Sequence, residues 1–427
     1  MQPFEGIEVV EFGQFIAVPF CAQLLAEGGA HVIKVESLDG DPVRHLAPLA
    51  PGETRHFVCR NRGKHSLPLD LKHPASRRVI DALLARADVV LTNFRPGFAG
   101  ELGLDYATLA PRHPRLIVGN VSAFGHYGPD AGLAGMDLVV QARSGLMAAT
   151  GKIANGVPAV GDPPLADYMC AMILAFGVAS ALFRRATTGR GGEVDVALLM
   201  AALTLQNNAM IRFEAGDGPS HREILQALAG LRGQGAPHAE QAALMPQIRV
   251  PGMINVYYRT FATKDSAMAV ACVSRGLQKT LMRAVGLVDN ALEKPIPDRD
   301  EQTRHYAAFR VRMEAVMASK TTAEWKEIFD RHGVPAAGVK FAIELLDDEQ
   351  PRANGMFQDF THPLAGRVRT LASPLRMDGD GFRARGATLP FGSEAREILG
   401  ALGFSASEVQ SLIDAGATRE KFAGHDA

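Results

Sequence analysis

Residues 7–36 read IEVVEFGQFIAVPFCAQLLAEGGAHVIKVE and indicate the fold class. The β-prone run Ile7–Phe12 ends at Gly13, residues 19–27 carry apolar side chains at helical spacing, and His31–Glu36 is β-prone again. Strand, helix and strand within about 30 residues is the spacing of a right-handed βαβ unit. This stretch therefore predicts two parallel strands joined by a helix.

The same alternation continues along the chain. We expect a helix at residues 75–87 and strands at residues 88–93 and 116–122. A parallel sheet flanked by helices follows, and such sheets bind ligands beyond the carboxyl ends of their strands. The segments that come directly after the expected strands are 11–14, 36–37, 93–96 and 122–125. The predicted fold class is therefore α/β.

The remaining chain is less regular. Residues 138–212 are predicted to be mainly helical, whereas residues 213–250 are rich in Gln, Ala and Gly and indicate a linker or insertion. Mixed structure returns at 253–340, where we expect strands at 257–261 and 267–273 and helices near 277–285 and 323–332. Two further helices are expected near residues 394–402 and 406–415.

Composition excludes several classes of protein. The chain has 427 residues, 47% of them hydrophobic, with a net charge of −1, so no overall field recruits nucleic acid or an anionic membrane. Its four cysteines are far apart, so neither a metal site nor a disulfide framework is indicated. The apolar run near residues 168–183 is short for a bilayer and predicts a buried helix. We expect a cytoplasmic protein without metal or membrane anchor.

Asp167 is the leading candidate for a catalytic residue. It follows the loop Gly161–Ala166 and precedes a long apolar run, so the sequence predicts an N-cap whose carboxylate faces unpaired helix N–H groups. The helix dipole favours the ionised form there. A carboxylate kept ionised and partly shielded from water can act as a nucleophile. The simpler interpretation is that Asp167 only caps its helix.

A basic segment gives the second candidate site. Residues 55–72 contain five Arg and Lys side chains, a composition that suits a multiply phosphorylated ligand, although a solvated basic loop is the simpler interpretation. The P-loop, nucleophile-elbow and zinc-helix signatures are missing, and the turn after the first strand lacks the glycine spacing of a dinucleotide fingerprint. The α/β pattern alone therefore does not indicate NAD.

Taken together, these pieces resemble the class III CoA-transferases, the CaiB/BaiF family of formyl-CoA transferase and carnitine CoA-transferase. The motifs include NRGKHSLPLDLK at residues 61–72, NFRPG at 93–97 and TGRGGEVDV at 188–196. The resemblance covers nearly the whole chain, with matching segments in order at residues 6–12, 24–36, 61–72, 93–97, 122–129, 141–146, 167, 188–196, 258–265, 333–336 and 362–366.

The resemblance implies an architecture. It suggests a Rossmann-like large domain whose N-terminal, CoA-binding part is residues 1–212, a linker or insertion at 213–250, and a smaller middle α+β domain at 251–335. Residues 336–427 would return to the large domain. The subunit would be ring-shaped and would interlock with a second copy into a homodimer.

The resemblance also implies a reaction. Asp167 falls on the family's nucleophile, which attacks an acyl-CoA thioester to give a mixed anhydride and then an aspartyl-CoA thioester. The substrates would be acyl-CoA and a carboxylic acid, with no permanently bound cofactor. CoA contacts carried over from the family, or offered by nearby residues where the chain departs from its pattern, are Gln14, Ile16, Ala17, Arg44, Leu69, Lys72, Asn93, Phe94, Arg95 and Asp137.

Three alternatives stay open. α-Methylacyl-CoA racemases share the fold and pair the aspartate with a His in a Gly-His-Asp motif, but here that motif is Gly135-Met136-Asp137, and His126 is a weak substitute. An intramolecular CoA shift between two carboxylates of one substrate uses the same chemistry. A non-catalytic CoA-binding protein is the third. In the insertion, candidates to pair with a second substrate carboxylate are Arg222, Arg232 and Arg249.

Overall fold

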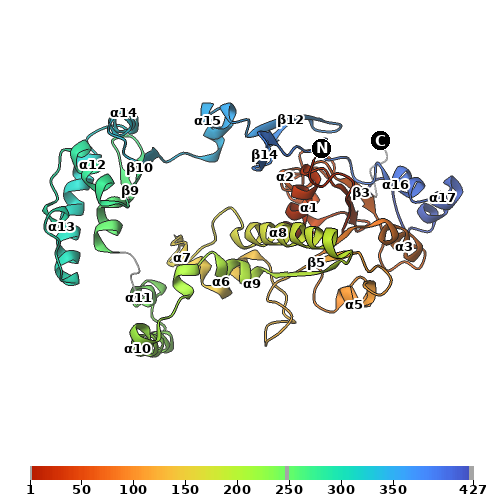
Figure 1. The fold of residues 1–427 in the computed structure, drawn as a ribbon, viewed down its shortest axis with the longest axis horizontal. Helices are drawn as coiled ribbons and strands as arrows, with labels where there is room; N and C mark the ends of the chain where they lie inside the picture. Colours follow the sequence, from red (N-terminus) through yellow and green to blue (C-terminus); the bar gives the residue numbers. More distant parts are fainter. Residues whose placement is uncertain (1, 246–249, 423–427) are drawn as a thin grey trace. The chain divides into compact units, whose positions relative to one another are not determined.

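The computed structural model describes residues 2–245 and 250–422 (Figure 1). The chain forms two compact units, and the larger one comprises Met1–Ala242 together with Arg352–Ala427. The smaller unit is Ala243–Pro351. Both ends of the chain therefore contribute to the larger unit, and the smaller unit extends beyond residue 335, where we had expected it to end.

The larger unit is built on one parallel sheet. Its strand order is β3-β2-β1-β4-β5-β8, and every neighbouring pair is parallel. The strands are β1 Glu8–Glu11, β2 His31–Glu36, β3 His65–Pro68, β4 Val89–Thr92, β5 Ile117–Ser122 and β8 Gly192–Ala197. The chain order reverses between β1 and β4, and ligands of open α/β sheets bind at such a switch point.

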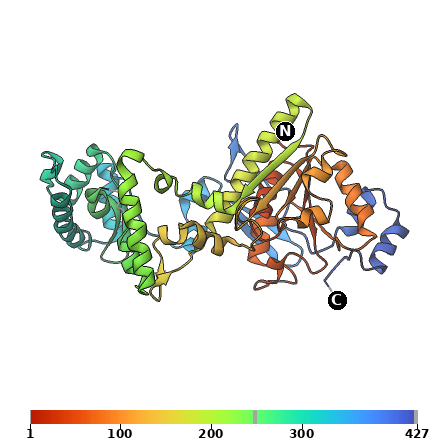
Figure 2. The same ribbon diagram turned by 90° about the horizontal axis from the view of Figure 1, so that it is seen from below.

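Alternation along the strands creates a core on each face of the sheet. In β1, Val9 belongs to one core and Val10 to the other, because successive side chains of a strand point to opposite faces. The first core packs against α1 (Ala17–Glu27), α8 (Leu165–Thr188) and α9 (Leu198–Thr204), and the second against α3 (Ser76–Arg86), α16 (Ala395–Ala401) and α17 (Ala406–Asp414). Figure 2 shows α8 running alongside the strands.

Further elements complete the larger unit. Two helices lie at the site described below, α2 Arg55–Asn61 and α6 Asp137–Ser144. The others are η1 Pro42–His45, α4 Phe98–Glu101, α5 Tyr106–Leu109, α7 Leu146–Ala149, β6 Ile153–Ala154, β7 Val157–Pro158, η2 Asn207–Met210, α10 Glu214–Gly233, β12 Phe357–His362, β13 Gly366–Leu371, β14 Arg376–Met377 and β15 Asp380–Gly381, with α11 His238–Ala243 and α15 Glu349–Ala353 at the boundaries between the units.

The smaller unit has its own core. An antiparallel sheet in the order β11-β10-β9 packs with three helices around Trp325, whose indole N–H donates to the Met317 carbonyl. The elements are η3 Met253–Tyr257, β9 Tyr258–Ala262, β10 Ala267–Ala271, α12 Arg275–Val285, η4 Asn290–Leu292, α13 Arg299–Met317, α14 Thr322–His332, β11 Ala336–Gly338 and η5 Ala342–Leu346.

Two helices differ from what the sequence suggested. Residues 214–233, which lie in the predicted linker or insertion, form the helix α10. The helix α8 is also not fully buried, because Phe176 and Phe183 are 76% and 77% exposed on the face that turns away from the sheet. Among the described residues, α8 is the one helix long and apolar enough to cross a membrane by length and composition, and a third of its most apolar window is buried.

Candidate active site

The loops after β1 and β4 are tied together at the switch point of the sheet. The Gln14 backbone N–H donates to the Asn93 side-chain oxygen at 3.0 Å, and the Asn93 amide donates back to the Gln14 carbonyl at 2.8 Å. Ile16 and Ala17 then begin α1, and no side chain caps that helix end. Four of the predicted CoA-binding residues therefore lie together at the point where the strand order reverses between β1 and β4. They are Gln14, Ile16, Ala17 and Asn93.

A buried ion network fixes the shape of the β1–α1 loop. Lys34 Nζ donates to the Gly13 carbonyl and Lys64 Nζ to the Pro19 carbonyl, both at 2.7 Å, and both lysines pair with Glu11. Phe15, between these anchors, has a φ of 65°, which is uncommon for a residue with a side chain. An unusual backbone held by surrounding contacts is typical of a ligand-binding loop.

Asp167 lies in the first turn of α8, but it does not cap that helix. The helix begins at Leu165 after Pro164, so Asp167 is its third residue. The cap comes from a different helix, because the Asp137 carboxylate accepts the Ala166 and Asp167 N–H groups at 2.9 and 3.2 Å. The N-cap assignment of Asp167 was wrong, since Asp137 already fills that role and leaves the Asp167 carboxylate free.

The electrostatics of Asp167 also differ from the expectation. Burial, reinforced by the nearby Asp137 carboxylate and opposed by Arg60, raises the pKa of Asp167 to about 7. The helix dipole therefore does not dominate, because its N–H groups are already taken by Asp137. Within the described chain, no hydrogen bond or ion pair reaches the half-buried Asp167 carboxylate. A poorly solvated, unpartnered carboxylate is suited to attack a carbonyl carbon.

Arg60 is the cation of this site. It is 6% exposed on α2, and its Nε donates to the Tyr168 hydroxyl at 3.2 Å while Nη1 donates to the His56 carbonyl at 2.9 Å. The guanidinium carbon also lies 5.5 Å from the Tyr168 ring centroid. Sequence reasoning placed Arg60 only within a basic segment, because nothing local indicates that it lies beside Asp167.

An aromatic and basic surface adjoins the switch point. The Phe94 ring lies 6.2 Å from Phe12 and 5.3 Å from Phe98, and Lys72 Nζ is 5.6 Å from the Phe98 centroid. Arg95 is exposed directly after Phe94. Aromatic faces and neighbouring cations suit an adenine ring and its phosphates. Lys72 and Phe94 thus both lie near Phe98, with Arg95 next along the chain, and their contact with CoA stays a prediction. Leu69 is fully buried in the core.

Arg44 has a different role from the expected one. It is 1% exposed, and its guanidinium donates to both oxygens of Glu36 at 2.7 and 2.9 Å and to Glu53 at 2.9 Å. It also stacks 3.4 Å over the Phe57 ring. Arg44 is therefore buried in ion pairs with Glu36 and Glu53 that stabilise the larger unit. Its assignment to a CoA phosphate was wrong, because its guanidinium is not accessible to a ligand. Asp137 accepts hydrogen bonds from α8 and from Gln141, and its predicted contact with CoA stays a prediction.

The basic segment 55–72 does not act as one cluster. Arg62 pairs with the buried Glu27 and Lys64 with the buried Glu11, so two of its five cations stabilise the interior. In the insertion, Arg222 is exposed, Arg232 donates to Gln241, and Arg249 lies outside the described residues.

The positions that would serve a racemase do not form an acid–base pair. Met136 is 54% exposed at the residue before α6, and methionine carries no proton to exchange. His126, the weak substitute, bonds Asp195 at 2.8 Å through Nε2. The imidazole thus has a carboxylate partner on β8.

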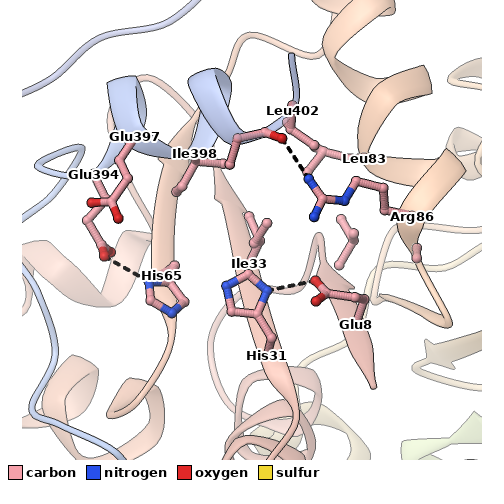
Figure 3. Close-up of a pocket in the computed structure, with 13 residues that line it drawn as sticks. Glu8, His31, Ile33, His65, Leu83, Arg86, Glu394, Glu397, Ile398 and Leu402 are labelled. Carbon is pink, nitrogen blue, oxygen red and sulfur yellow. Dashed lines mark hydrogen bonds and ion pairs between the residues drawn. The ribbon is translucent and has the colours of Figure 1, made fainter. Parts of the chain in front are cut away.

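A small cavity lies at the opposite end of the sheet. Its volume is about 110 Å³, and it is lined from the amino ends of β1, β2 and β3 and from α16 (Figure 3). Two histidines border it, His31 bonded to Glu8 at 2.7 Å and His65 bonded to Glu394 at 2.8 Å. The cavity is too small for CoA and lies away from the carboxyl ends of the strands, where open α/β sheets bind their ligands.

Comparisons with known proteins identify the family of the chain. The sequence profile of "CoA-transferase family III" matches residues 4–393. Cinnamoyl-CoA:phenyllactate CoA-transferase of Clostridium sporogenes is 28% identical over 96% of this chain and 95% of its own length. Acetyl-CoA:oxalate CoA-transferase of Acetobacter aceti is 28% identical over 88% of this chain and 90% of its own.

Solved structures give the same result. The crystal structure of Rv3272 from M. tuberculosis superposes with a TM-score of 0.74 at 25% identity, covering 93% of this chain and 99% of that one. A CAIB/BAIF family protein from Brucella suis gives a TM-score of 0.71 at 25% identity, over 94% of this chain and 99% of that one. With the family profile spanning most of its length, the chain belongs to CoA-transferase family III, a family of enzymes.

Proposed function

We propose that the protein transfers CoA from an acyl-CoA thioester to a carboxylic acid, with Asp167 as the nucleophile. The single observation that carries the assignment is the state of Asp167, a half-buried carboxylate without a partner among the described side chains and with a pKa near 7. Relatives named as CoA-transferases over nearly the whole chain support the reaction class.

The proposed steps balance without an external energy source. The Asp167 carboxylate attacks the thioester carbonyl, which gives a mixed anhydride and releases CoA thiolate. The thiolate attacks the Asp167 side of the anhydride, so the first acid leaves and Asp167 carries CoA as a thioester. The acceptor carboxylate repeats these steps in reverse. Each step exchanges one activated acyl group for another, so no ATP is consumed.

The surrounding residues have defined parts in this proposal. Asp137 holds the first turn of α8 and so fixes the direction of the Asp167 side chain. The loops joined through Gln14 and Asn93, with the uncapped start of α1, would cradle the pantetheine and pyrophosphate. Lys72, Phe94 and Arg95 would contact the nucleotide end of CoA.

We further propose a cytoplasmic homodimer in which two interlocked copies cover each other's apolar surfaces. The exposed face of α8 supports a partner, since Met172, Phe176 and Phe183 are 45%, 76% and 77% exposed along one helix. A second copy of the chain accounts for this apolar helix without a membrane. The free cysteines, among them the exposed Cys59, suit a reducing compartment.

The test is substitution of the nucleophile. Asp167→Ala should lower CoA transfer by at least about 1,000-fold while the protein stays folded, as judged by circular dichroism and gel filtration. Asp300→Asn is a matched control, because Asp300 is an exposed aspartate in the first turn of a helix in the smaller unit. Transfer by Asp167→Ala at a tenth of the normal rate or faster would exclude the assignment.

A further inference from the structure

Arg60 has an incomplete set of partners for a buried cation. Within residues 2–245 and 250–422, it forms no ion pair, and its hydrogen bonds use only Nε and Nη1. The second terminal nitrogen, Nη2, has no protein partner there. A buried charge without a counter-ion is costly, so residues of this kind are usually paired. The Asp167 carboxylate is near enough to interact with this charge but forms no ion pair with it, so Nη2 is open to an anion from outside the protein.

The position of Arg60 identifies which anion is missing. Its Nε is bonded to the hydroxyl of Tyr168, the residue next to Asp167, and the charge of Arg60 acts on the Asp167 carboxyl. The other nearby anion, Asp137, has both oxygens bonded, one to two N–H groups of α8 and one to Gln141. Arg60 therefore lies near the carboxylate with which the substrate must react.

We propose that Arg60 binds the reacting carboxylate of the acid substrate, an inference that rests on the proposed function of Asp167. A planar guanidinium with a free Nη2 can donate to a carboxylate oxygen while Nε and Nη1 keep it fixed on Tyr168 and His56. Arg60 is therefore a substrate-binding residue, and the class of ligand is any carboxylate that fits beside Asp167.

The change in the charge of Asp167 during the reaction gives the contact between Arg60 and the substrate carboxylate a role in the order of binding. In the free enzyme the Asp167 carboxylate opposes an incoming acid, and Arg60 offsets that charge. Once Asp167 carries CoA as a thioester it is neutral, so Arg60 is left as the uncompensated charge. The site then attracts a carboxylate at the step in which the acid must attack. Free enzyme favours the neutral thioester, and loaded enzyme favours the acid.

The experiment separates this contact from the rest of the reaction. Enzyme is loaded with CoA from a donor such as succinyl-CoA, the released acid is removed by rapid gel filtration, and discharge of the adduct is followed by mass spectrometry. Discharge is started with the donor's own acid, here succinate, or with hydroxylamine. Hydroxylamine is a neutral nucleophile that needs no cation, so it reports the integrity of the aspartyl thioester.

Arg60→Gln should slow discharge by the acid at least about 100-fold and leave discharge by hydroxylamine within about threefold of the unaltered enzyme. Arg60→Lys should restore part of the rate with the acid, because it returns a cation without the planar fork. Arg304→Gln, at an exposed position of α13, is the control and should change neither rate.

Two results would overturn the inference. One is discharge of Arg60→Gln by the acid at a rate within threefold of the unaltered enzyme. The other is equal slowing by both nucleophiles in both Arg60 variants, which would mean that Arg60 only supports Tyr168. Tyr168→Phe removes that hydrogen bond and should not reproduce the loss specific to the acid. Absence of any adduct on the unaltered enzyme would instead refute the proposed function of Asp167.

Discussion

Asp167→Asn should make the protein more stable as well as inactive. The carboxylate is half-buried near Asp137, and its pKa rises from the ordinary 3.8 to about 7, so ionisation of Asp167 opposes folding. A rise of that size lowers the free energy of unfolding by about 4 kcal/mol at most when Asp167 is ionised. Water reaches the half-buried carboxylate, so we expect about 2 kcal/mol in practice. Asparagine keeps the shape of the side chain without its charge.

The sign of this effect fixes its pH dependence. The folded state holds the Asp167 proton more tightly than the unfolded state, so stability falls as pH rises from about 4 to about 7 and then stays level. Asp167→Asn has no carboxylate to ionise, so its stability does not fall over this pH range for that reason. The two proteins should therefore be equally stable near pH 4, and the variant should be more stable by a constant amount above about pH 7.5.

The assay is urea denaturation of both proteins from pH 4 to pH 8.5, with Asp300→Asn as the control for the substitution itself. The difference between the two proteins cancels every other titrating group. Equal stability at pH 8, or a variant less stable than the unaltered protein there, would refute the claim that the site holds Asp167 in an unfavourable ionised state.

The remaining predictions follow from the same contacts. Transfer should rise about tenfold per pH unit up to about pH 7 and then level off, since Asp167 must be ionised; a flat profile from pH 5 to 8 would contradict this. Glu11→Gln should lower the free energy of unfolding, measured by urea denaturation, by about 3 kcal/mol, because it removes a carboxylate that pairs with both Lys34 and Lys64. A decrease of less than about 1 kcal/mol would count against a stabilising role of this ion network. Phe176→Glu should give monomers by sedimentation velocity if a second copy covers α8; an unchanged dimer would place the interface elsewhere. No deuterium should enter a 2-methylacyl-CoA from heavy water, because Met136 replaces the base of a racemase, and rapid exchange would revive that function.

The sequence was sufficient to predict a strand where the local hydrophobic pattern agrees with the burial of the segment. The strands at 31–36, 89–92 and 117–122 are apolar runs between turns, and the structure has them within a residue or two of the expected bounds. The strand His65–Pro68 was not predicted, because four residues ending in proline carry no periodic signal. Helix α10 was not predicted within the linker or insertion, since it contains Gly216, Gly218 and Pro219, which disfavour helices.

The site was predictable only in part, because its key contacts join distant residues. The family resemblance predicted Asp167, and the ends of parallel strands predicted that Gln14 and Asn93 lie near each other, which they do. The roles of these residues stay predictions. Nothing local shows that Asp137 caps a helix 30 residues later or that Arg60 bonds Tyr168, 108 residues away. Such tertiary contacts influence the charge state of Asp167. They also pair Arg44 with Glu36, so that Arg44 is not free to bind a phosphate.

The most direct test of the central claim is intact-protein mass spectrometry after brief incubation with a panel of acyl-CoAs that includes succinyl-CoA. Borohydride or hydroxylamine trapping and peptide mapping then locate any adduct. We predict a CoA-sized adduct, or its trapped remnant, on Asp167, and none in Asp167→Asn. An adduct on a different residue, or CoA transfer by the unaltered enzyme without any adduct on Asp167, would contradict the mechanism.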